Sequence, residues 1–179
     1  MIAILLNDAS FEQDIRELLM AFYPGETFTH KEEEAGEADL IVRGVRDGNS
    51  FSLDVTPVKK EAVHFALIYP DFSNRFETKN EIKQTLYRLL SVQTGRELPW
   101  GTLTGIRPTK IALTKLYDGW TDEQIETYMR ETYFTSKEKI DLSIDVAERE
   151  RRLLSTIDYE NGYSLYVGIP FCPTTCLYC

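Results

Sequence analysis

The chain has very little cysteine or histidine and no long hydrophobic run. Its 179 residues include three cysteines and two histidines, and no stretch approaches the roughly 18 apolar residues that a membrane-spanning helix needs. The opening residues MIAILLN carry no basic residue and Asp8 follows at once, so we expect no secretory signal peptide. These absences predict a cytoplasmic protein whose thiols are reduced.

The chain also has fewer basic than acidic residues. Lysine and arginine number 20 against 29 acidic residues, which gives a formal net charge of −9. Non-specific nucleic-acid binding needs a basic face, so this balance argues against a nucleic-acid partner. Glycine and proline number only 10 and 7, so the composition is typical of a folded chain rather than a disordered one.

Hydrophobic periodicity predicts an α+β domain over residues 1–96. We expect, in order, a strand at the start, a helix over 10–25, a weak strand over 26–30, strands over 38–46, 50–58 and 63–69, and a helix over 77–95. Phe51, Leu53 and Val55 alternate with polar residues, as in a half-buried antiparallel strand. The sequence therefore predicts an antiparallel sheet with helices packed on one face.

Beyond this domain the pattern changes to helices alone. A helical region is expected over residues 97–158, with helices over 108–117, from Thr121 and from about 135 to 157. The capping-box spacing, in which Gln or Glu follows Ser or Thr by three residues, marks three helix starts: Ser10 with Gln13, Thr121 with Gln124, and Thr135 with Glu138. A final strand over 163–170 is expected to lead into the cysteines.

All three cysteines lie in the segment FCPTTCLYC, with the spacing Cys172-x3-Cys176-x2-Cys179. A redox pair could use Cys176 and Cys179, but such pairs usually precede a helix. Covalent haem attachment would need a histidine after the second cysteine, and a structural zinc site would need a fourth ligand. Three thiolates on one tight loop instead favour a [4Fe–4S] cluster in which one iron has no protein ligand and can bind a small chelating molecule.

This cysteine spacing, with an aromatic residue before the third cysteine, resembles the signature of the radical S-adenosylmethionine (SAM) enzymes. The longer segment LYVGIPFCPTTCLYC (165–179) is similar to the oxygen-independent coproporphyrinogen III oxidase group. Upstream, WGTLTGIRPTK (100–110) resembles a segment that precedes the radical domain in the HemZ branch, coproporphyrinogen dehydrogenase. The resemblance implies that residues 159–179 are the first strand and cluster loop of a truncated radical SAM (β/α) barrel, so the chain is an amino-terminal fragment.

The resemblance also implies roles for particular residues. Cys172, Cys176 and Cys179 would be the ligands of the cluster, and Tyr166 and Tyr178 would lie beside SAM, although packing alone is the commoner role of an aromatic residue near a strand. Gly168 departs from the pattern, because related sequences have histidine at this position.

The implied reaction is the oxidative decarboxylation of coproporphyrinogen III to protoporphyrinogen IX in haem biosynthesis, with electrons from a donor protein. The fragment by itself would be inactive. Two other functions stay open. One is a radical SAM-related haem chaperone, and the other is an accessory domain that binds RNA, protein or porphyrin.

The TGIRPTK segment offers one further candidate site. Pro108 is expected in the first turn of a helix, with Arg107 before it and Lys110 just inside it. Helix N-termini bind anions through free backbone N–H groups, so Arg107 and Lys110 could hold a carboxylate or a phosphate. The alternative is an ordinary helix start whose basic side chains remain in solvent.

Overall fold

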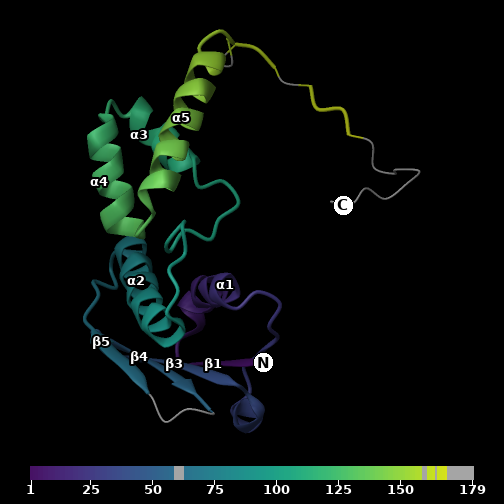
Figure 1. The fold of residues 1–179 in the computed structure, drawn as a ribbon, viewed down its shortest axis with the longest axis vertical. Helices are drawn as coiled ribbons and strands as arrows, with labels where there is room; N and C mark the ends of the chain where they lie inside the picture. The colour runs from purple at the N-terminus through teal and green to yellow at the C-terminus, as the bar shows by residue number, and fades with distance from the viewer. Residues whose placement is uncertain (59–62, 159–160, 164, 169–179) are drawn as a thin grey trace.

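The computed structural model describes residues 1–58, 63–158, 161–163 and 165–168. The described residues form a sheet layer with two long helices on one face, and three more helices stack beyond them (Figure 1). The elements follow in this order: β1 (Ile2–Leu6), the 3-10 helix η1 (Ala9–Phe11), α1 (Glu12–Phe22), β2 (Phe28–Thr29), the 3-10 helix η2 (Glu32–Glu37), β3 (Leu40–Asp47), β4 (Ser50–Pro57), β5 (His64–Ile68), α2 (Arg75–Thr94), α3 (Lys110–Tyr117), α4 (Asp122–Tyr133) and α5 (Lys137–Leu154). The predicted α+β class is confirmed.

The sheet is mixed rather than antiparallel throughout, which corrects one part of the expectation. Its strand order is β2-β1-β3-β4-β5. β1 pairs in parallel with β2 and β3, whereas β4 pairs antiparallel with β3 and β5. The physical reason is the crossover through α1, because a helix between two strands returns the chain in the same direction. Alternation within single strands identified them but carried no information on their direction.

The main core lies between the sheet and the helices α1 and α2. Ile4, Val42 and Leu53 are buried on the inner face of the sheet, where they pack against Ile15 of α1 and Leu86 of α2. The helices therefore cover one face of the sheet, as expected (Figure 1). On the opposite face a smaller cluster joins β1 to η2 and contains Ala3, Leu5, Ala35 and Ala38.

A second core is formed by α3, α4 and α5. It contains Leu113, Ile125, Met129, Ile144 and Ala147 together with their neighbours. Each of these helices buries one apolar face and leaves charged residues on the other, as in helices of soluble proteins. Among the described residues, no helix has the length and apolar character to cross a membrane.

The helix α2 joins the two cores. The side-chain amide of Gln84 donates to the carbonyl oxygen of Thr132 over 2.8 Å, and the ring of Tyr87 lies 5.6 Å from that of Phe134, centroid to centroid. These contacts attach the end of α4 to the sheet-covering helix. The boundaries drawn at residues 96 and 158 stay a prediction.

Helix starts agree with the capping prediction in one case out of three. Thr121 and Gln124 form the complete capping box of α4. At α5 the cap is Ser136, whose hydroxyl accepts from the backbone of Lys139, so the predicted pair was one residue away. At α1 the predicted pair is wrong, because the carboxylate of Asp8 accepts from the Ser10 backbone and draws that residue into η1.

The strand expected over 163–170 is absent from the part of it that the structure describes. Residues 163 and 165–168 have no regular secondary structure and run away from α5 (Figure 1). A β-strand is held by hydrogen bonds to a neighbouring strand, and no described strand lies beside these residues.

Candidate functional site

Most of the predicted cluster site lies outside the described residues. Cys172, Cys176, Cys179 and Tyr178 all fall in the range 169–179. Among the residues that the structure does describe, no group of three or more His, Cys, Asp or Glu side chains is placed to hold a metal ion. The cysteine ligands therefore stay a prediction from the sequence.

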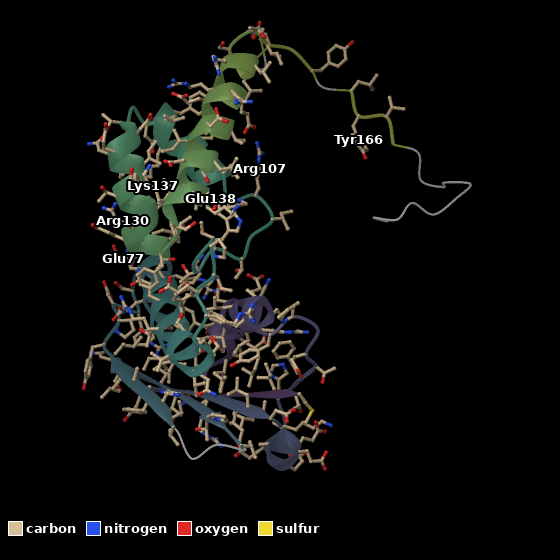
Figure 2. The ribbon with its side chains drawn as sticks, viewed as in Figure 1. Glu77, Arg107, Arg130, Lys137, Glu138 and Tyr166 are labelled. Atoms are coloured by element: carbon tan, nitrogen blue, oxygen red, sulfur yellow. The ribbon has the colours of Figure 1, made fainter. Side chains whose placement is uncertain are left out.

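Tyr166 is the one predicted SAM-contacting residue that the structure describes. Its side chain is 92% exposed and lies on the segment after α5, apart from the helices (Figure 2). At Gly168, a Cβ atom would lie 3.0 Å from the Tyr166 ring, so even a small side chain there would require Tyr166 to shift. The contact of Tyr166 with SAM stays a prediction.

Lys110 is the first residue of α3 and Arg107 precedes the helix, but Pro108 lies two residues before α3 and not in its first turn as predicted. The guanidinium of Arg107 pairs with the carboxylate of Glu150 on α5. The backbone N–H groups of Lys110 and Ile111 donate to the carbonyls of Arg107 and Pro108 over 3.2 and 3.3 Å. Two N–H donors at the helix start and one of the cations are therefore engaged within the chain, while the Lys110 side chain is exposed.

The segment that contains WGTLTGIRPTK forms one wall of a groove against α1. The groove has a volume of about 620 Å³. Its lining residues come from α1 and from the 100–108 segment: Glu17, Met20, Ala21, Trp100, Leu103, Thr104, Gly105, Ile106 and Pro108. Figure 1 shows this segment running from the end of α2 past α1 towards α3. We define these residues as the α1 groove.

A chain of hydrogen bonds connects the α1 groove to a buried lysine. The ammonium of Lys83 on α2 donates to the hydroxyl of Thr104 over 2.9 Å, and that hydroxyl donates to the carboxylate of Glu17 over 2.8 Å. Lys83 is only 7% exposed. Its burial lowers the pKa of the ammonium below 10.5, and the carboxylates of Asp14 and Glu17 partly offset that effect.

Gly101, the first glycine of the WGTLTG sequence, explains how this segment comes to lie against the end of α4. Gly101 has a φ of 58° and a Cβ atom there would overlap the carbonyl oxygen of Tyr133. The backbone N–H of Thr102 donates to the same oxygen over 2.7 Å. The end of α4 therefore holds the segment through contacts that only glycine permits at position 101.

The outer face of β3 and β4 is the part of the sheet on which an RNA-binding surface would lie. Arg43 on β3 lies opposite Asp54 on β4 and also bonds to Glu32 over 2.6 Å. Phe65 and Leu67 on β5 are exposed apolar neighbours. The described residues of this face thus pair Arg43 with acids, while β5 exposes the aromatic ring of Phe65. The RNA-binding alternative stays a prediction.

Glu17 and Lys83 are not among the candidates predicted from the sequence, because nothing in their local pattern distinguishes them. The pattern around Glu17 predicts a polar residue of an amphipathic helix. The pattern around Lys83 predicts a solvated residue of a second helix. The sequence separation between Glu17 and Thr104 is 87 residues. The available signal was Trp100, which lies in the WGTLTGIRPTK segment and lines the α1 groove.

Comparison with known proteins finds one informative likeness. The chain is 35% identical over 128 residues to the oxygen-independent coproporphyrinogen-III oxidase-like protein HemZ of Bacillus subtilis (strain 168). The match covers 69% of this chain and 25% of the relative, so the chain spans about a quarter of that protein's length. No family model and no solved structure matches. The resemblance of this chain to the HemZ branch of oxygen-independent coproporphyrinogen-III oxidase-like proteins is therefore confirmed.

Proposed function

We propose that the chain is the amino-terminal part of a longer cytoplasmic enzyme that oxidatively decarboxylates coproporphyrinogen III to protoporphyrinogen IX by radical SAM chemistry. The observation that carries the proposal is the Cys172-x3-Cys176-x2-Cys179 spacing. It occurs in a chain similar to a protein named as an oxygen-independent coproporphyrinogen-III oxidase-like protein. A donor protein would supply electrons, and no nucleic acid would take part.

The three cysteines fit a [4Fe–4S] cluster by the chemistry of their donor atoms. Thiolates are the ligands that iron–sulfur clusters prefer, and three of them leave one iron free for the amino and carboxylate groups of SAM. When bound, the cluster and SAM would supply one-electron cleavage of the sulfonium bond and removal of hydrogen from a propionate side chain.

The other residues of the segment would position SAM rather than react. Tyr166 and Tyr178 would pack beside it. Gly168 has no side chain to donate a hydrogen bond or a proton where related sequences have histidine, so any proton needed at this place must come from another residue. We infer that this difference affects the efficiency of the reaction and leaves the binding of the cluster intact.

The test uses the longer protein that carries this chain, reconstituted with iron and sulfide without oxygen. After reduction, SAM and coproporphyrinogen III are added, and 5′-deoxyadenosine and protoporphyrin are measured together. We expect both products from the wild type, neither from Cys176→Ala, and both from the control Thr175→Ala, which alters the same loop without removing a thiol. The 179-residue chain assayed alongside is expected to give neither product.

Other outcomes would assign a different function. Deoxyadenosine without porphyrin conversion would keep the radical chemistry and reject the substrate. Haem binding without either product would favour the radical SAM-related haem chaperone. If both products survive in Cys176→Ala, the cysteine assignment is wrong.

A further inference from the structure

The α1 groove has the composition of a small-molecule site. Apolar side chains make up most of its lining, among them Trp100, Leu103 and Met20. Its volume of about 620 Å³ falls within the range of roughly 300–1,000 Å³ typical of ligand sites. Such a groove, with a few polar groups and a neighbour whose pKa is shifted, is a candidate binding site.

Part of this apolar surface lies open to solvent. Ile106 is fully exposed and Met20 is 51% exposed. Ile106 follows Gly105 at the rim of the groove, where it contributes to the lining. An apolar rim of this kind would lose its contact with water if a ligand with an apolar body occupied the groove.

The polar end of the groove is built around one carboxylate. Among the described residues that line it, Glu17 is the only charged one. Its Oε2 atom accepts from Thr104 over 2.8 Å and its Oε1 atom accepts from Gln13 over 3.1 Å. Each carboxylate oxygen can accept a second hydrogen bond, so Glu17 is held in position and keeps acceptor capacity.

Lys83 determines which group donates in the hydrogen bond between Thr104 and Glu17. Because the ammonium of Lys83 donates to the Thr104 hydroxyl, that hydroxyl is left to donate its own proton to Glu17. The Thr104 hydroxyl therefore accepts one hydrogen bond from Lys83 and donates one to Glu17. The lysine itself is buried behind Thr104 and is absent from the lining of the groove. A ligand would therefore meet an acceptor and a negative charge, and not the lysine.

We propose that the α1 groove binds a small amphipathic cation, with its apolar body against Trp100 and Leu103 and an ammonium or guanidinium group on Glu17. A carboxylate ligand is disfavoured, because it would meet Glu17 in a chain of net charge −9. A purely apolar ligand would leave the acceptor capacity of Glu17 without a partner. This inference is independent of the cysteine cluster and of the proposed reaction.

The test uses three naphthalene probes with the same apolar body and different charge. They are 2-naphthylmethylammonium, 2-naphthalenemethanol and 2-naphthoate, each titrated into the 15N-labelled 179-residue chain and followed by NMR. We expect the ammonium probe to bind more tightly than the alcohol, and the naphthoate to bind most weakly. The indole N–H of Trp100 should shift to saturation. The other tryptophan, Trp120, lies against the ammonium of Lys115, 4.3 Å from the ring centroid to Nζ, and should not shift.

Two variants and one control separate the polar from the apolar contribution. Glu17→Gln should weaken the ammonium probe by about tenfold or more and leave the alcohol unchanged. Ile106→Ser, which alters a fully exposed side chain, should weaken both probes. The control Glu123→Gln removes an equivalent charge from the groove beside Trp120 and should change neither.

Three results would overturn the proposal. The first is naphthoate binding as tightly as the ammonium probe. The second is an ammonium affinity that Glu17→Gln leaves unchanged. The third is the absence of any saturable shift at Trp100 in the millimolar range.

Discussion

At the scale of single residues, the least expected feature is a lysine inside the molecule. Lys83 is 7% exposed and its ammonium donates a hydrogen bond to the neutral hydroxyl of Thr104. Removing an ammonium from water is costly unless charges nearby compensate. Asp14 and Glu17 supply part of that compensation, yet burial still lowers the pKa of Lys83.

This pKa predicts how stability responds to pH. Because the unfolded chain binds the Lys83 proton more tightly than the folded chain, stability must rise as the pH increases from the lowered pKa towards 10.5. We expect the free energy of unfolding of the wild type, relative to Lys83→Met, to increase over that range. Urea unfolding at a series of pH values measures it.

Lys110→Met is the matched control for this effect, because it removes an exposed lysine. The free energy of unfolding of the wild type, relative to Lys110→Met, should not rise by a comparable amount over the same pH range. A wild-type advantage over Lys83→Met that falls or stays level towards pH 10.5 would show that Lys83 is not buried as described.

The sequence predicted on which element some functional candidates lie, but it did not predict which candidates contact one another. Pro108 predicted a helix start within two residues of its observed place at Lys110, but the ion pair of Arg107 with Glu150 joins residues 43 apart. Likewise Lys83, Thr104 and Glu17 meet only in three dimensions. Local patterns report which residues share a helix face, and they carry no information on which helices later lie side by side.

At the scale of single elements, helix ends show which local signals are reliable. The Thr121 capping box forms as predicted, because both members are free to bond each other. Ser10 fails as a cap because Asp8 accepts its backbone N–H first. Competing caps within two residues of each other cannot be ranked from spacing alone.

The cap of α4 gives a direct prediction. Thr121→Ala should lower the free energy of unfolding by about 1 kcal/mol, since the backbone N–H of Gln124 loses its acceptor. Thr127→Ala makes the same substitution at an exposed position inside α4 and should be neutral or slightly stabilising. Chemical denaturation followed by circular dichroism compares the two. Equal losses in both variants would show that the cap contributes nothing of its own.

The junction between α2 and α3 depends on a single glycine. At Gly101 the positive φ and the nearby carbonyl of Tyr133 both exclude a side chain. We expect Gly101→Ala to cost at least about 2 kcal/mol, from backbone strain and from the contact with that carbonyl. The comparison is Gly105→Ala in the same segment, where a Cβ would meet no atom within 4 Å. Their urea midpoints should differ clearly, and coincident midpoints would contradict the described position of Gly101.

At the scale of the whole molecule, the core under the sheet and the core of α3, α4 and α5 are connected by contacts between α2 and the end of α4. Single-strand and single-helix patterns predicted the α+β class, and they separated a sheet region from a helical one. They missed the parallel pairing of β1, because strand direction follows from a crossover and not from alternation. They also predicted a strand over 163–170 that residues 163 and 165–168 do not form, since pairing needs a neighbour as well as a suitable sequence.

The central claim is that Cys172, Cys176 and Cys179 hold a cluster with one open iron. The most direct measurement is the EPR spectrum of the reduced cluster in the reconstituted longer protein, recorded with and without SAM. We predict a [4Fe–4S] signal whose g values change when SAM is added, because SAM would bind the iron that lacks a thiolate. The signal should be lost in Cys176→Ala and kept in Thr174→Ala. A signal that SAM leaves unchanged, or one that survives in Cys176→Ala, would contradict the claim.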